Sequence, residues 1–237
     1  RSKDDYREEA ETNIATLRRG IHREFYDTEQ GVYLLPEQVY QAMPLMTGVV
    51  PPELVDPVKS RLIGLIEAQG WHLDSGLPGT TLLIELLTEL GEHELLGNVY
   101  AQETYPGFGY MLASGATTIW EQWNGFWSQI HSCFAGPAVW FYQGLAGIKP
   151  DASGPGFKYF TLAPAFLDDI AFVDAAYESA SGRIESAWRS EGKTVTWRVT
   201  IPDGCTARLQ LPCGIKTPFT IDGAPVSTRT FSRSGGS

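Results

Sequence analysis

The fold of this chain is decided at residues 150–156, which read PDASGPG. Two prolines and two glycines within seven residues interrupt helices and strands alike. Before this stretch apolar residues recur every three or four positions, and after it they recur every second position. The change of period predicts a helical domain over residues 1–150 and a β domain over residues 151–231. Residues 232–237, which read SRSGGS, are expected to form a flexible tail.

The first helix is expected over residues 6–25. Its apolar residues are spaced by three and four, which places them on one helix face: Ala10, Ile14, Leu17, Ile21 and Phe25. That face must pack against something. Similar spacing predicts further helices over residues 57–68, 80–90, 94–103 and 136–147, joined by loops that contain Gly and Pro. The first 150 residues therefore read as a succession of helices.

The region after residue 156 has the alternation of strands with one buried face. The alternating apolar residues are Val195, Trp197, Val199 and Ile201, then Ala207, Leu209 and Leu211, and upstream Ile184 and Trp188. These candidate strands lie about ten residues apart, with Gly and Pro turns between them. This spacing predicts an antiparallel β-sandwich, so the fold class is α+β with two domains.

Composition excludes several classes of partner. The chain has 237 residues, and its formal net charge of −10 argues against binding to nucleic-acid phosphates. No apolar run approaches the roughly 20 residues that a membrane span needs, so we expect no membrane segment. The three cysteines fit no metal-ligand spacing, and we expect no metal.

One stretch is unusually rich in aromatic residues and glycine. Residues 104–127 read TYPGFGYMLASGATTIWEQWNGFW. Aromatic rings pack against the apolar C–H faces of sugar rings, while a few polar groups bind the hydroxyls. Any single ring here is more typical of a loop core, but the cluster as a whole indicates a sugar-binding site.

Glu121 is the strongest catalytic candidate in this stretch. It follows Trp120 and is two residues from Trp123, so large apolar side chains frame its carboxyl group. A carboxyl group that is partly removed from water suits acid and base chemistry. An isolated Glu among tryptophans is also compatible with an ordinary surface residue.

Residues 106–123, PGFGYMLASGATTIWEQW, resemble the signature of glycoside hydrolase family 78, which holds the α-L-rhamnosidases. In that family a Tyr-Pro-Ser-Trp-Gly-Tyr-Met stretch leads into Gly-Ala-Thr-Thr-Ile-Trp-Glu-Arg-Trp. The resemblance continues at residues 72–76 (HLDSG), 140–148, 155–158 and 182–188, and so covers nearly the whole chain.

The resemblance implies part of a catalytic (α/α)6 barrel followed by a C-terminal β-sandwich. It implies an inverting hydrolase that releases terminal α-L-rhamnose from glycosides or polysaccharides, without a metal or organic cofactor. By motif, Glu121 would be the general base that activates water. Trp120, Trp123 and Tyr110 would shape the pocket, and His131 and His72 would contact the sugar.

The resemblance also implies a missing part. The family's general acid lies in a motif of the first half of the barrel, which has no counterpart here, and residues 1–150 suffice for only about half of a barrel. We therefore expect this chain to be a fragment whose partner is the N-terminal half of the barrel. Gln122 replaces the family's Arg, and Gly107 and Phe108 replace Ser-Trp, which leaves the subsite preference open.

Two alternatives remain open at this point. The chain could be a degenerate, non-catalytic sugar-binding module that kept the aromatic stretch and lost the acid. It could also belong to another (α/α)6 enzyme, such as a fucosidase, a phosphorylase or a polysaccharide lyase.

Overall fold

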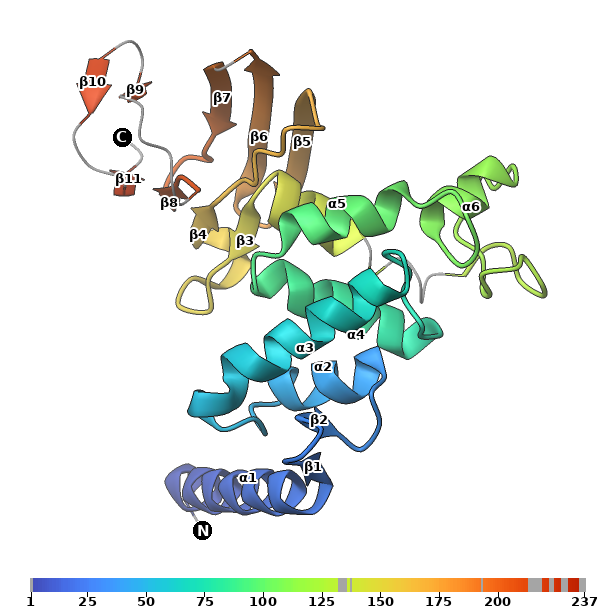
Figure 1. Cartoon of the computed structure of the whole chain (residues 1–237). Coiled ribbons are helices and arrows are strands. Elements are labelled where there is room, and N and C mark those ends of the chain that lie inside the picture. Colours follow the sequence, from blue (N-terminus) through green and yellow to red (C-terminus); the bar gives the residue numbers. More distant parts are fainter. Residues whose placement is uncertain are drawn as a thin grey trace. The chain divides into compact units, whose positions relative to one another are not determined.

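The computed structural model describes residues 2–131, 136, 138–192 and 194–212, together with three strands beyond them (Figure 1). Its contacts divide the chain into two compact units, residues 1–136 and 137–237. The first unit is helical and the second is built from strands, so the predicted order of helices before sheets is confirmed. Among the described helices, none combines the length and the apolar character that crossing a bilayer requires.

The helical unit contains six α-helices, a short hairpin and a 3-10 turn within the described residues. They are α1 (Lys3–Phe25), β1 (Tyr26–Asp27), β2 (Val32–Tyr33), α2 (Gln38–Met46), the turn Pro52–Leu54, α3 (Val55–Ala68), α4 (Leu77–Glu89), α5 (His93–Ala101) and α6 (Phe108–Ala113). Helix α2 packs against α3 and α4, and α5 packs against α4 and α6 (Figure 1).

The apolar periodicity of α3, α4 and α5 explains the core of this unit. Residues at spacings of three and four are fully or nearly fully buried: Val58, Leu62 and Ile66 on α3, Leu83, Ile84 and Leu87 on α4, and Leu95, Leu96 and Val99 on α5. Each helix thus turns one continuous stripe inward. The helices expected over residues 57–68, 80–90 and 94–103 are confirmed, with starts one to three residues earlier.

No described residue buries the apolar face of α1. The helix begins with a capping box between Ser2 and Asp5 but has no buried residue. Ile14 is 47% exposed and Leu17 is 62% exposed. Polar contacts hold α1 to the unit, among them a hydrogen bond from Arg18 Nε to the carbonyl of Thr47 at 2.8 Å and an approach of 2.8 Å between His22 Nδ1 and the Tyr33 hydroxyl. The expectation that this face packs is therefore not met by the described residues.

The second unit begins with a π-helix over Trp140–Leu145, where the sequence predicted an ordinary helix over residues 136–147. Its described strands are β3 (Ile148–Pro150), β4 (Tyr159–Leu162), β5 (Phe172–Ser179), β6 (Gly182–Glu191), β7 (Thr194–Thr200), β8 (Thr206–Gln210), β9 (Phe219–Ile221), β10 (Ala224–Val226) and β11 (Thr230–Ser234), with a 3-10 turn at Pro155–Phe157.

The strands form two main sheets. One has the order β5-β6-β7 and is antiparallel, the other has the order β11-β8-β4-β3, and β9 pairs with β10 as a separate hairpin. Strands β4 and β8 run parallel, a pairing that local alternation did not predict. Both main sheets contribute side chains to one core, which includes Ile148, Phe160, Leu162, Ile184, Ala207 and, packed against it, Val173, Trp197 and Leu209. This is the arrangement of a β-sandwich.

Side-chain hydrogen bonds tie the residues just before β3 to the antiparallel sheet. Ser186 Oγ, which is fully buried, donates to the carbonyl of Ala146 at 2.6 Å, and Trp188 Nε1 donates to the carbonyl of Leu145 at 2.8 Å. These bonds help explain why the contacts divide the chain after Gly136, upstream of the sequence-derived boundary at residue 150. That boundary stays a prediction.

The structure describes only part of the tail that the sequence predicted over residues 232–237. Strand β11 carries residues 230–234 and pairs with β8, so it includes the first residues of the expected tail. Residues 235–237 lie outside the described residues, as do Cys133 and Cys213. Cys205 is a buried free thiol.

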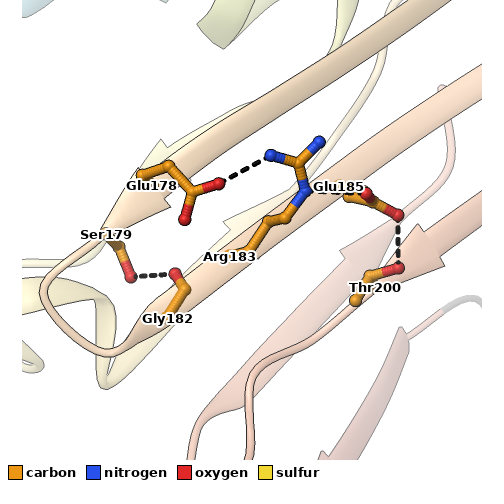
Figure 2. A network of polar contacts seen from close by, with 6 residues as sticks. All are labelled: Glu178, Ser179, Gly182, Arg183, Glu185 and Thr200. Carbon is orange, nitrogen blue, oxygen red and sulfur yellow. Dashed lines mark hydrogen bonds and ion pairs between the residues drawn. The ribbon is translucent and has the colours of Figure 1, made fainter.

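A polar network crosses the antiparallel sheet on its exposed surface (Figure 2). Arg183 donates to Glu178 Oε1 at 2.6 Å and to Glu185 Oε1 at 2.9 Å, and the Thr200 hydroxyl donates to Glu185 Oε2 at 2.8 Å. Glu178 and Thr200 stand directly opposite Arg183 and Glu185 on neighbouring strands. The hydrogen bonds from Arg183 and then from Thr200 hold the pKa of Glu185 below its usual value of 4.5.

This network makes a prediction about stability in acid. Because the pKa of Glu185 is lower in the folded state, its ionised form stabilises the fold above the unfolded-state pKa, and this contribution is lost as the pH falls through the folded pKa. Glu185→Gln should therefore lower the free energy of unfolding at neutral pH, and the difference from wild type should shrink as the pH falls below 4.5 and disappear once it has fallen through the lower pKa of the folded state. Urea unfolding followed by tryptophan fluorescence measures both values.

Thr200→Val is the control, because it keeps the ion pair with Arg183. It should differ less from wild type in the free energy of unfolding than Glu185→Gln does. A gap that persists undiminished in strong acid would contradict this account.

Candidate functional site

The Glu121 loop, residues 117–131, folds back on itself. The backbone N–H of Glu121 donates to the carbonyl of Ser128 at 2.8 Å, and that of His131 donates to the carbonyl of Ile119 at 2.9 Å. The hydroxyl of Thr118 also donates to the carbonyl of Gln129. These contacts pair the two limbs of the loop, so residues seven to twelve positions apart in sequence lie side by side.

The paired limbs place Glu121 beside two polar groups. Its Oε2 atom accepts a hydrogen bond from the backbone N–H of Ser128 at 3.2 Å and lies 3.7 Å from Nδ1 of His131. The Glu121 side chain is 23% exposed and that of His131 is 31% exposed. The carboxylate is thus held by a backbone donor, faces a potential cation, and remains accessible to water.

The two tryptophans that frame Glu121 are both buried. The ring of Trp120 packs so closely against Gly125 that a Cβ there would lie 3.0 Å from it, and Gly125 has a φ of +75°. Trp123 donates from Nε1 to the carbonyl of Ser75 at 3.1 Å and meets Phe108 edge-on, with ring centroids 5.0 Å apart. Both rings therefore stabilise the loop, and their predicted contact with a sugar stays a prediction.

Two other rings of the same loop are open to solvent. Trp127 is 69% exposed and Phe126 is 60% exposed, and their ring centroids lie 5.7 Å apart. The aromatic density that the sequence pointed to is thus divided between buried rings that shape the loop and exposed rings beside it.

His72 and Tyr110 lie on segments around the loop. His72 Nδ1 lies 2.7 Å from the carbonyl of Pro106 and Nε2 lies 3.0 Å from the hydroxyl of Thr104. Because a carbonyl only accepts, Nδ1 donates, and both ring nitrogens are engaged. Tyr110, on α6, is half-buried and meets Tyr105 edge-on, with centroids 5.5 Å apart. Sugar contacts of either residue stay predictions.

The structure therefore brings Glu121 and His131 together, while the imidazole of His72 contacts Thr104 and Pro106, which lie outside the loop. Sequence reasoning missed Ser128 and Ser75, because both act through backbone groups that any residue carries. Among the described residues, no three His, Cys, Asp or Glu side chains gather as metal ligands would.

Comparison with known families decides the membership of the chain. Residues 2–145 match the model of the bacterial α-L-rhamnosidase 6 hairpin glycosidase domain, and residues 147–220 match that of the bacterial α-L-rhamnosidase C-terminal domain. The chain belongs to the bacterial α-L-rhamnosidase family. The two models meet close to β3, which begins at Ile148.

Relatives of this rhamnosidase-family chain include an α-L-rhamnosidase of Alteromonas sp. (strain LOR), 30% identical over 214 residues, which cover 85% of this chain and 23% of the relative. Another, from Formosa agariphila, is 30% identical over 175 residues, covering 69% of this chain and 19% of the relative. The chain thus spans about a quarter or less of these relatives.

Solved structures show the same fold. The α-L-rhamnosidase of Streptomyces avermitilis, complexed with L-rhamnose, matches 95% of this chain and 23% of its own with a TM-score of 0.82 and 23% identity. That of Dictyoglumus thermophilum matches 97% of this chain and 27% of its own with a TM-score of 0.84, also at 23% identity. The predicted fold class, part of an (α/α)6 barrel followed by a β-sandwich, is confirmed.

Proposed function

We propose that this chain is part of an inverting glycoside hydrolase that releases terminal α-L-rhamnose, with Glu121 as the general base. The observation that carries the proposal is the setting of the Glu121 carboxylate in the family motif: Oε2 is held at 3.2 Å by the N–H of Ser128, while the side chain keeps a 23% exposed fraction. A base must be fixed in direction and still reach a water molecule.

His131 has a supporting role in this proposal. Its Nδ1 lies 3.7 Å from Glu121 Oε2, too far for a hydrogen bond in this state and near enough for electrostatic attraction when the imidazole is protonated. A proton taken by Glu121 from water would change the charge that His131 faces. The N–H of Ser128 orients the carboxylate, and the half-buried imidazole of His131 beside it is available to a sugar hydroxyl.

Inversion needs a second carboxyl group, which protonates the leaving oxygen from the opposite side of the sugar. The two groups must stand about 6.5–9.5 Å apart, so that a water molecule fits between the base and the sugar. Within the part of the chain that the structure describes, the ion-pair partner of Glu121 is His131 and not a second carboxyl group. We place the general acid in the N-terminal half of the barrel, outside this chain.

The same missing half would cover the open face of α1. A row of apolar side chains with exposed fractions from 38% to 62% runs along this helix, at Ile14, Leu17, Ile21 and Phe25. Barrel helices normally bury such a stripe against a neighbouring helix. The half-barrel and the absent acid thus support one proposal, that catalysis requires both halves of the barrel.

The test compares the complete protein with the 237-residue chain. The complete protein, given an aryl α-L-rhamnoside, should release the phenol and rhamnose whose first-formed anomer is β, as NMR of the fresh product detects. The 237-residue chain alone should release neither, because it lacks the acid. Turnover by the isolated chain at the rate of the complete protein would place the acid inside it and contradict the division. Rhamnose binding by the complete protein without turnover would instead favour a non-catalytic module.

A further inference from the structure

Helix α2 carries two glutamines, Gln38 and Gln41, whose residues are 0% exposed. They lie about one helical turn apart and form hydrogen bonds with different segments of the chain. Gln41 accepts from the backbone N–H of Tyr33 at 2.8 Å and donates to the carbonyls of Leu35 and Glu37 at 2.7 and 3.0 Å. Gln41 thus holds the chain that leads into α2, and its contacts do not extend toward the candidate site.

Gln38 contacts the segment that follows α3. Its Nε2 atom donates to the carbonyl of His72 at 2.8 Å, and its Oε1 atom accepts from the backbone N–H of Asp74 at 3.2 Å. Its own backbone N–H donates to Asp74 Oδ2 at 3.3 Å. Glu37, the N-cap of α2, makes no side-chain cap, so Asp74 supplies an acceptor to this helix N-terminus from 36 residues away.

The segment His72–Ser75 also reaches both stretches of the family motif. The imidazole of His72 contacts Thr104 and Pro106 through its two nitrogens, at 3.0 and 2.7 Å. The carbonyl of Ser75 accepts from Nε1 of Trp123 at 3.1 Å. Trp123 and Glu121 belong to the same folded-back loop. Hydrogen bonds therefore join Gln38 to His72 and Asp74, the backbone continues from Asp74 to Ser75, and a further hydrogen bond joins Ser75 to the loop that carries the candidate base.

We propose that Gln38 is a positioning residue, which fixes the Glu121 loop by holding the segment His72–Ser75 in place. The inference rests on the proposed function of Glu121. The position requires one donor and one acceptor on a single planar group, because it must meet the carbonyl of His72 and the N–H of Asp74 together. Glutamine offers both, whereas methionine of similar length offers neither and glutamate at neutral pH lacks the donor.

The experiment compares Gln38→Met with Gln41→Met in the complete protein. Both variants remove a fully buried amide from α2 and should lose comparable thermal stability. Only Gln38→Met should lower kcat, on the order of 10-fold or more with a smaller change in KM, because a small displacement of a catalytic group slows the chemical step. Equal losses of kcat in both variants, or full kcat in Gln38→Met, would overturn the proposal.

A second readout does not depend on activity. In the ¹⁵N-labelled 237-residue chain, the indole N–H signal of Trp123 should move in Gln38→Met and stay in place in Gln41→Met. An unmoved signal in Gln38→Met would break the proposed connection. If Gln38→Met does not fold, Asp74→Ala at an exposed position removes the acceptor for the Gln38 N–H and should move the same signal, and a stationary signal would count against the proposal.

The two proposals fail separately. If Glu121→Gln keeps full turnover, the assignment of the base is wrong, whatever Gln38→Met does. If Glu121→Gln abolishes turnover while Gln38→Met leaves kcat and the Trp123 signal unchanged, the assignment of Glu121 as the base is supported and the positioning role of Gln38 is wrong.

Discussion

Glu121→Gln in the complete protein is expected to lower kcat on an aryl α-L-rhamnoside by about 10²–10⁴-fold, because an amide cannot take a proton from water. The substitution is nearly isosteric, and the amide oxygen can still accept from the N–H of Ser128, which Glu121 Oε2 does at 3.2 Å. The fold and the affinity for rhamnose should therefore change little. Steady-state kinetics, thermal denaturation and rhamnose titration calorimetry measure the three quantities.

The control is Glu89→Gln, at an exposed position near the end of α4. It makes the same chemical change away from the loop and should leave kcat unaltered. Azide provides a further check, because it attacks without needing a base and should restore part of the turnover of Glu121→Gln. A loss of tenfold or less, with the protein folded, would remove Glu121 from the role of base.

Gly147→Ala is expected to destabilise the strand-built unit by about 3–5 kcal/mol, the sum of backbone strain and overpacking. Gly147 has a φ of +73°, and a Cβ at this position would overlap the backbone of Ala163 and Pro164. These neighbours cannot move away easily, because the N–H of Ala163 donates to the carbonyl of Gly147 at 2.9 Å beside the β3–β4 pair. Chemical denaturation of the 237-residue chain measures the loss, and hydrogen exchange of β3 and β4 locates it.

Gly204→Ala is the matched control for this prediction. Gly204 has a φ of +70°, but a Cβ there would meet no atom within 4 Å. The variant should therefore cost only the left-handed backbone strain, about 1 kcal/mol. Equal losses of stability in the two variants would contradict the prediction, because they would show that the close approach of Gly147 to Ala163 and Pro164 adds nothing to the backbone strain.

Local pattern predicted the elements whose apolar residues keep a clean period. Helices α3, α4 and α5 and strands β6, β7 and β8 belong to this group. Helix α2 was missed because the inward positions 38 and 41 carry glutamine and because Pro44 lies inside the helix. Strand β5 was missed because apolar and polar residues do not alternate regularly along Phe172–Ser179, and neither does the exposure of their side chains.

The candidate site, like the fold, was predicted from the sequence only in part. Glu121 came from the motif that carries the family resemblance, and its role stays a prediction. The donors and acceptors that hold its loop are the N–H of Ser128 and the carbonyl of Ser75, which leave no trace in side-chain identity. Gln38 gives no signal in the sequence, because its role depends on the carbonyl of His72 and the N–H of Asp74, more than 30 residues away.

The sequence by itself determined that helices precede strands, where the period changes, and to which family the motif points, because these depend on residues close together in the chain. Only the tertiary structure decided that β4 and β8 run parallel, that the described residues leave the apolar face of α1 uncovered, and that Gln38 is connected to Trp123 through residues 72–75. The physical reason is that these features join groups separated by tens of residues, and backbone hydrogen-bonding groups are the same at every position.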